Sequence, residues 1–182
     1  MPHSDGANKG WVLEKINQIK PKSILDVGTG SGILEEIVRE NFGNSIRLDG
    51  IEAWEPYISE FNLTERYDNL YNVDAREWEN WDYDLVMFGD VLEHMVESES
   101  SALWNKVSQQ AGNAIITIPI IHYPQGASFG NPYEIHHEDH WDTERILKVF
   151  PGISEYKEFE ITGAYFAKFK DEVISKPDMA IS

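Results

Sequence analysis

Residues 24–32 read ILDVGTGSG, an apolar run that leads directly into glycines at alternate positions. Apolar side chains then recur at helical spacing over 31–41, so the glycines lie between a predicted strand and a predicted helix. Open α/β sheets bind their ligands at such a turn. Gly28, Gly30 and Gly32 would let the backbone approach a ligand and present amide N–H groups near the start of the helix. The stretch predicts a ligand-binding loop at the carboxyl edge of a parallel sheet.

The rest of the chain alternates between strand and helix patterns. Short apolar runs predict strands at 23–27, 45–52, 70–74, 83–89 and 113–118, and helical spacing predicts helices at 8–19, 56–66, 98–111 and 143–150. This alternation implies right-handed βαβ units around a parallel sheet. Two further strands, 153–160 and 164–170, are separated by Thr162-Gly163 and suit a closing antiparallel hairpin. We expect an α/β, Rossmann-like doubly wound sheet of seven strands, mostly parallel, with one reversed strand in the C-terminal hairpin.

Length and composition favour one soluble domain over residues 1–182. The chain has no cysteine, which excludes disulfides and thiolate chemistry. The net charge of −17 disfavours nucleic acid, because such binding rests on Lys and Arg neutralising phosphates. No apolar run approaches the ~20 residues that cross a bilayer, and residues 1–10 lack the apolar core of a signal peptide. We expect a cytoplasmic protein without a membrane partner, and leave its oligomeric state open.

The domain divides into four segments by their patterns. These are an N-terminal helix (8–20), a ligand-binding half (22–118), a loop (119–141), and a helix with the closing hairpin (142–170). The loop is rich in Pro, Gly, His and aromatic residues, and loops of that length in compact domains are usually functional. We expect it to be a lid or substrate loop, and expect the tail, 175–182, to fray.

The residues around the glycines indicate which ligand binds there. A dinucleotide fingerprint, G-x-G-x-x-G/A, fits poorly because Ile33 occupies its last position. Asp26 ends the strand, where its carboxylate would repel a pyrophosphate but could accept hydrogen bonds from an ammonium group. The ligand is therefore expected to carry a cationic amine, as S-adenosylmethionine does, and an NAD-dependent enzyme is disfavoured.

Five segments in order resemble the motifs of class I S-adenosylmethionine-dependent methyltransferases. They are ILDVGTGSG, IRLDGIEAW, NVDA, YDLVMFGDVLEHM and NAIITIPI, and the resemblance spans residues 22–170. It implies S-adenosylmethionine as cofactor, with Glu52 on the ribose hydroxyls, Asp74 at the adenine amino group and the fourth-strand motif near the sulfonium. The expected cofactor-binding residues are Asp26, Gly28, Thr29, Gly30, Gly32, Glu52, Ala53, Trp54, Asp74, Ala75 and Asp90. Structural alternatives remain: a plain turn at the glycines, a solvated Glu52, Asp74 as a helix cap, and Trp54 in core packing.

Asp90 and His94 are the candidate catalytic residues. The sulfonium is an activated leaving group, so the enzyme mainly aligns the acceptor, although a hydroxyl or amine acceptor also benefits from a base. His94 is the candidate base because its unperturbed pKa lies near neutrality. It could equally be a structural residue of the DVLEH motif.

A metal site is a less favoured addition. Asp90-x-x-Glu93-His94 resembles the metal-binding signature of ubiquinone-pathway O-methyltransferases and small-RNA 2′-O-methyltransferases, although those groups usually have Glu at the first position. Carboxylates and imidazole suit Mg²⁺, Mn²⁺ or Zn²⁺, and His140 in the loop could add a ligand. The same motif also occurs in enzymes without metal. Asn131-Pro132-Tyr133 is interpreted as a turn.

The acceptor is expected to meet the loop, because no inserted domain appears between the first and fifth strands. His122, Tyr133, His136 and His137 are the candidate substrate residues, and they suit a small polar or partly aromatic acceptor. The predicted function is methyl transfer from S-adenosylmethionine to an O or N atom of a small molecule by in-line displacement. The alternatives are an RNA or protein methyltransferase, with or without metal assistance, and a non-catalytic binding module, which the intact motifs disfavour.

Overall fold

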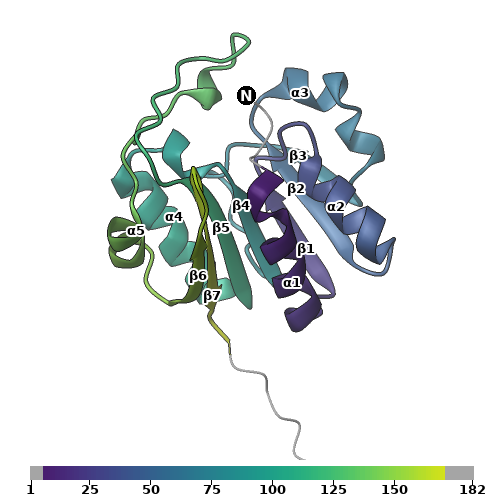
Figure 1. Cartoon of the computed structure of the whole chain (residues 1–182). Helices are drawn as coiled ribbons and strands as arrows, with labels where there is room; N and C mark the ends of the chain where they lie inside the picture. The colour runs from purple at the N-terminus through teal and green to yellow at the C-terminus, as the bar shows by residue number, and fades with distance from the viewer. Residues whose placement is uncertain (1–5, 171–182) are drawn as a thin grey trace, which may run out of the picture.

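A seven-stranded sheet lies between two layers of helices in the computed structural model, which describes residues 6–170 (Figure 1). The strands are β1 (Ser23–Val27), β2 (Arg47–Glu52), β3 (Asn69–Asn72), β4 (Leu85–Gly89), β5 (Asn113–Pro119), β6 (Ile153–Glu158) and β7 (Thr162–Lys168). The α-helices are α1 (Lys9–Ile19), α2 (Ile33–Phe42), α3 (Glu55–Glu60), α4 (Glu97–Gln110) and α5 (Thr143–Val149). Single 3₁₀ turns are η1 (Gly6–Asn8), η2 (Leu63–Glu65), η3 (Leu92–His94) and η4 (Pro132–Glu134).

The strand order is β3-β2-β1-β4-β5-β7-β6. Strands β1 to β5 pair in parallel, whereas β7 runs antiparallel between β5 and β6. This confirms the predicted doubly wound sheet with its reversed strand. The order reverses between β1 and β4, and ligands of such sheets bind in the crevice outside the carboxyl ends of the strands at that point.

Both faces of the sheet are covered, which explains why its central strands read as continuous apolar runs. Along β4, Leu85 and Met87 belong to the core cluster that includes buried residues of α1 and α2. Val86 and Phe88 point to the opposite face and belong to the cluster that includes residues of α4 and α5. The alternation follows from the two-residue period of a strand.

Two element predictions differ from the structure. The predicted helix at 56–66 breaks after α3, where Asn62 adopts a left-handed backbone (φ 52°) before η2. Asn tolerates that conformation better than most residues. The predicted turn at Thr162-Gly163 is also wrong, because both residues lie in β7 and the chain reverses at 159–161. Gly163 serves packing instead, since a Cβ there would lie 2.4 Å from the Tyr165 hydroxyl oxygen.

The 119–141 loop extends beyond the edge of the sheet at which β5 ends (Figure 1). Its two ends are tied together by a hydrogen bond from the Tyr123 N–H to the Asp139 carbonyl (3.1 Å). Asn131 begins η4, where its side chain accepts from the Tyr133 N–H (2.9 Å), so the predicted turn is present in 3₁₀ form. The expected fraying of 175–182 lies outside the described residues. Between residues 6 and 170, no helix combines the length and apolarity that a membrane crossing requires.

Candidate active site

A cavity of about 100 Å³ lies at the carboxyl ends of β1, β2 and β4. It occupies the point at which the strand order reverses, where the fold places its ligands. The loop 119–141 contributes part of its wall. The lining residues are Gly28, Gly30, Ile51, Glu52, Ala53, Tyr57, Val73, Asp74, Ala75, Arg76, Asp90, Val91, His94, Met95, Asn131, Tyr133 and Glu134.

The glycines of the β1–α2 turn do not share one role. Gly28 and Gly30 line the cavity, whereas Gly32 does not. Gly32 has a φ of +81°, and a Cβ there would lie 2.6 Å from the Arg66 guanidinium. That guanidinium donates to the Ser31 and Gly32 carbonyls, each at 2.8 Å. The expectation that all three glycines admit a ligand is therefore wrong for Gly32. The space that a side chain would occupy there is filled by Arg66 and not by a ligand.

Glu52 holds the glycine turn in place at the end of β2. Its buried carboxylate accepts hydrogen bonds from the Gly30 N–H (2.9 Å) and the Trp54 N–H (2.8 Å). The Thr29 hydroxyl also donates to it (3.3 Å). Burial raises the pKa of Glu52, and these three hydrogen bonds oppose the rise. Thr29 and Trp54 do not line the cavity, but both donate hydrogen bonds to Glu52, which does.

Asp74 and Ala75 follow β3 and line the cavity beside Ala53. The Asp74 carboxylate accepts from the Arg76 N–H (2.9 Å) and from its guanidinium Nη2 (2.5 Å). Burial raises the pKa of Asp74, but the hydrogen bonds from Arg76 outweigh it and leave the pKa below its usual value. Asp74 is therefore an ionised acceptor at the cavity wall.

Asp26 lies away from the cavity, although its motif predicts a cofactor contact. Its side chain is buried, and its Oδ2 accepts a hydrogen bond from the Tyr67 hydroxyl (2.6 Å). Burial raises the pKa of Asp26 to about 7 against the opposing effect of that hydrogen bond. The structure therefore gives Asp26 an internal partner from the segment that follows η2.

Asp90 and His94 both line the cavity. Asp90 adopts a left-handed backbone (φ 54°) directly after β4, a conformation that tends to occur at functional sites. The pKa of His94 is lowered to about 4, by burial first and then by the neighbouring His136. Burial therefore moves the pKa of His94 away from the near-neutral, unperturbed value that made it the candidate base.

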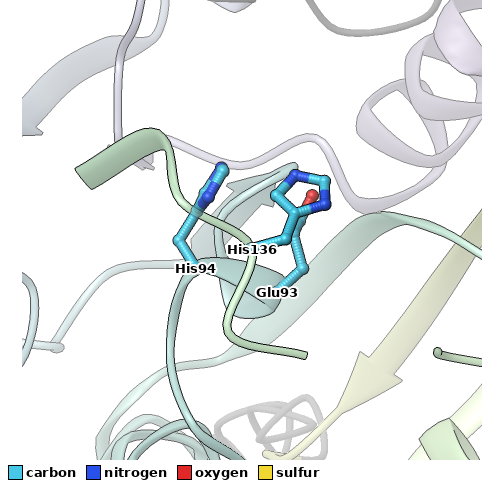
Figure 2. A group of neighbouring side chains, drawn as sticks. All are labelled: Glu93, His94 and His136. Atoms are coloured by element: carbon cyan, nitrogen blue, oxygen red, sulfur yellow. The ribbon is translucent and has the colours of Figure 1, made fainter. Parts of the chain in front are cut away.

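Glu93, His94 and His136 form one cluster, in which the ligand atoms lie within 4.8 Å of one another. Figure 2 shows Glu93 and His94 rising from η3 beside His136 of the loop. Glu93 is 1% exposed, and neither carboxylate oxygen has a hydrogen-bond partner among the described residues. Burial, and next the charge of Asp90, raise the pKa of Glu93 well above its usual range. The loop histidine beside Glu93 and His94 is His136, not the predicted His140.

Main-chain carbonyls orient both imidazoles of this cluster. His94 Nδ1 lies 3.3 Å from the Ile135 carbonyl oxygen, and His136 Nδ1 lies 2.6 Å from that of Tyr123. A proton on each Nδ1 satisfies these carbonyls and leaves each Nε2 with its lone pair. Metal-ligating histidines are commonly oriented in this way. A buried carboxylate beside two such imidazoles is a ligand set for a divalent cation.

Of the other predicted loop residues, Tyr133 lines the cavity and its ring lies 6.5 Å from that of Trp54. His137 is exposed, and its N–H donates to the Glu93 carbonyl (2.9 Å). His122 and His140 lie together beside Asp139, outside the cavity lining. Only Tyr133 of the four predicted substrate residues therefore reaches the cavity wall.

Sequence reasoning missed the contact between Tyr57 and Glu134. The Tyr57 hydroxyl donates to Glu134 Oε1 (3.2 Å), and both residues line the cavity together with Asn131. Tyr57 lies in a segment with ordinary helical spacing, and Glu134 lies in a loop that contains several other acidic residues and histidines. No local signal relates two positions so far apart in the chain.

No protein-family model matches the sequence, and no curated protein does either. Solved structures do match. The 1,6-didemethyltoxoflavin-N1-methyltransferase of Burkholderia thailandensis, with S-adenosylhomocysteine bound, is 12% identical, with a TM-score of 0.65 over 92% of this chain and 80% of that one. The methyltransferase domain of a bacterial Hen1 is 15% identical, with a TM-score of 0.64 over 88% and 97%. Human N-acetylserotonin methyltransferase, in complex with S-adenosylmethionine, is 14% identical, with a TM-score of 0.65 over 89% and 51%.

The chain spans only 55% of the length of two further matches, a Nostoc punctiforme protein described as an O-methyltransferase and PigF with S-adenosylhomocysteine. At these identities the comparisons establish the fold. The chain has the Rossmann-like fold of class I S-adenosylmethionine-dependent methyltransferases.

Proposed function

We propose that this protein transfers a methyl group from S-adenosylmethionine to an O or N atom of a small-molecule acceptor. The observation that carries the proposal is the cavity at the reversal of the strand order. Its wall combines the backbone of Gly28 and Gly30 with the carboxylates of Glu52 and Asp74. Glycine backbone and two acceptors at successive strand ends suit a nucleoside with hydroxyl and amino donors. The matched structures that hold S-adenosylhomocysteine or S-adenosylmethionine support the same cofactor.

The charge of the cavity wall supports a cationic cofactor. Four carboxylates line it, from Glu52, Asp74, Asp90 and Glu134, whereas the one lining cation, Arg76, is paired with Asp74. S-adenosylmethionine supplies an activated methyl group on a positively charged sulfur. A wall of this sign attracts that charge and favours a neutral or cationic acceptor.

The chain's residues align the reactants more than they move protons. Asp90 and His94 line the cavity beyond the glycine turn, and Tyr133 and Glu134 close it from the loop. With its pKa near 4, His94 is a weak acceptor of a proton at neutral pH. We assign it to holding the acceptor or a cation. The lack of cysteine in the chain also suits the cytoplasmic location that we propose.

Calorimetric titration with S-adenosylhomocysteine tests the cofactor assignment. Glu52→Ala is a poor variant, because it would also release the N–H groups of Gly30 and Trp54. Asp74→Asn keeps an oxygen for the Arg76 N–H but loses the charge that would face an amino group. Hydrogen bonds to charged groups contribute about 1.5–3 kcal/mol, so affinity should fall ~10- to 100-fold.

Glu99→Gln is the matched control, because Glu99 also pairs with Arg76 but does not line the cavity. It should bind like the wild type. Failure of the wild type to bind S-adenosylhomocysteine or S-adenosylmethionine would contradict the proposal.

A metal-assisted reaction is the second candidate, and the buried Glu93 favours it. An ionised carboxylate without a partner is costly to bury, and burial accordingly raises the pKa of Glu93 well above its usual range. Glu93, His94 and His136 fit a divalent cation and would hold it. Such an ion would polarise an acceptor hydroxyl and lower its pKa. A metal-assisted reaction could also serve an RNA or protein acceptor. The net charge of −17 and the acidic cavity wall argue against RNA.

The variant Glu93→Gln tests whether Glu93 is a metal ligand. Gln keeps the shape and neutrality of the protonated side chain, so the variant should fold like the wild type. If the cluster binds metal, Mn²⁺ or Zn²⁺ should raise the melting temperature of the wild type and of the control variant Glu97→Gln. The same metal should raise the melting temperature of Glu93→Gln by a smaller amount. An equal metal response in all three proteins would exclude Glu93 as a ligand.

A further inference from the structure

A second group of potential ligands lies at the base of the loop, outside the cavity. His122 Nε2 is 3.3 Å from Asp139 Oδ2, and His140 Nδ1 is 2.8 Å from Asp139 Oδ1. The two imidazole rings stack with centroids 4.1 Å apart and an angle of 18° between them. One ligand atom from each residue lies within 4.8 Å of the others. His122 and His140 are exposed, so the group faces solvent.

The main chain on both sides of this group is fixed by other contacts. The Tyr123 N–H donates to the Asp139 carbonyl (3.1 Å), which pairs the chain beside His122 with the chain at Asp139. Arg145 Nη1 donates to the His140 carbonyl (2.8 Å), and its guanidinium lies 4.3 Å from the centroid of the Trp141 ring. The three side chains are therefore brought together by a backbone that does not depend on them.

Two imidazole nitrogens and a carboxylate oxygen are ligands that Zn²⁺ and neighbouring transition metals accept. Metal–ligand distances of about 2.0–2.2 Å require neighbouring donors to approach to roughly 3.3 Å in a tetrahedral site. The observed separations lie around that value, and exposed side chains can rotate to adjust them. A fourth position would stay open to water, because the site faces solvent.

We propose that His122, Asp139 and His140 form a binding site for a divalent transition-metal ion such as Zn²⁺. The ion would cross-link the two ends of the 119–141 loop, since His122 lies near its start and Asp139 and His140 near its end. The middle of that loop supplies Asn131, Tyr133 and Glu134 to the cavity wall. Metal binding at the base would therefore restrict the segment that covers the cavity. This site is separate from the cluster of Glu93, His94 and His136.

The proposal does not require that the protein be a methyltransferase, so binding can be tested without activity. Untagged, chelator-treated protein is titrated with Zn²⁺, and with Co²⁺ for its visible spectrum. Six proteins are compared: wild type, His122→Ala/His140→Ala, His94→Ala/His136→Ala, the variant that combines these four changes, His94→Ala/His136→Ala with Asp139→Asn, and His137→Ala as an exposed-histidine control from the same loop. Circular dichroism verifies the fold of each.

We expect a Zn²⁺ affinity that survives in the His94/His136 variant and in the His137 control, but falls at least tenfold when His122→Ala and His140→Ala are added to the His94/His136 variant. Saturating Zn²⁺ should also slow amide hydrogen exchange in 119–141 of the His94/His136 variant, in which the cluster of Glu93, His94 and His136 no longer contributes. Two results would overturn the site: no saturable binding to the His94/His136 variant, or binding to that variant that survives the loss of His122 and His140. If Asp139→Asn, added to the His94/His136 variant, leaves its Zn²⁺ affinity unchanged, the carboxylate is not a ligand and the three-residue site is refuted.

Discussion

The hydroxyl of Tyr57 donates a hydrogen bond to Glu134 Oε1 (3.2 Å), and through it α3 contacts the loop that covers the cavity. Gln125 Nε2 donates to the other oxygen of that carboxylate (3.0 Å). Glu134 therefore links another residue of the 119–141 loop to the ligand-binding half, residues 22–118. Burial raises the pKa of Tyr57 to about 12, so the hydroxyl remains a donor at physiological pH. The contact makes the position of the loop depend on the helix that follows β2.

Tyr57→Phe should loosen the loop without unfolding the domain. A hydrogen bond to a charged group contributes about 1.5–3 kcal/mol, and the variant keeps the aromatic ring that packs on Phe61. Amide hydrogen exchange over 119–141 should become faster, and affinity for S-adenosylhomocysteine should fall about tenfold. Tyr123→Phe, in an exposed tyrosine of the same loop, is the control and should leave both unchanged. Unaltered exchange in Tyr57→Phe would show that the contact does not hold the loop.

Gly32→Ala should destabilise the protein through Arg66. The added Cβ would lie 2.6 Å from the guanidinium and would also occupy a left-handed backbone. Gly130→Ala has a similar φ (+78°) with nothing within 4 Å of its Cβ, so it measures the backbone effect of about 1–2 kcal/mol alone. Urea unfolding should show a larger loss for Gly32→Ala. Adding Arg66→Ala to Gly32→Ala should cost less than the sum of the single changes, and strict additivity would refute the steric explanation.

The stability contributed by Asp26 should depend on pH. Its pKa is about 7 in the folded protein and near its usual value when unfolded, so the folded state binds the extra proton between those values. Stability is therefore lost as the pH rises from about 4 to 7, by a total on the order of 4 kcal/mol at 1.36 kcal/mol per unit. Asp26→Asn removes this titration and can still accept from Tyr67.

Urea unfolding of wild type and Asp26→Asn at several pH values checks the sign. The variant should gain stability relative to the wild type as the pH rises, and the gap should level off above pH 7. The other titratable groups contribute equally to the free energy of unfolding of both proteins, so their contributions cancel in the difference. A gap that is constant with pH would mean that the pKa of Asp26 is the same in the folded and unfolded protein, which would contradict the prediction.

Phe129 should be replaceable with a gain in stability. Its side chain is 80% exposed and its backbone is left-handed (φ 52°), followed by Gly130 at +78° in a turn closed by the Ser128–Asn131 bridge. Two successive positive φ values are those of a tight turn that prefers Asn-Gly. Phe129→Asn should raise the free energy of unfolding by up to about 1 kcal/mol. A higher KM in the variant, once an acceptor is known, would assign Phe129 to acceptor binding, and a destabilised variant would contradict the backbone argument.

The fold could be predicted because its signals are local. The apolar runs of the parallel strands are buried on both faces, and the predicted strand at 23–27 coincides with β1. The element predictions that were wrong concern where a helix or strand ends. The helix at 56–66 breaks at Asn62, and Gly163 lies within β7, where the Tyr165 side chain occupies the space that a Cβ would need.

Only part of the candidate site could be predicted, because the rest depends on contacts between segments that are far apart in the chain. Glu52, Asp74, Asp90 and His94 follow strands whose carboxyl ends meet, so topology alone brings them to one cavity. The pKa of His94 could not be predicted, because it depends on burial beneath the loop and on His136.

The sequence by itself determined the sheet, the glycine turn and the strand-end carboxylates, because an apolar run or a glycine spacing is written in consecutive positions. Only the tertiary structure decided which histidine joins Glu93, where Asp26 finds its partner and which residues of the loop reach the cavity. Those outcomes depend on how a long loop folds back over the sheet. Its path is set by hydrogen bonds such as those from the N–H groups of His137 and Glu138 to the Glu93 carbonyl, which no local pattern encodes.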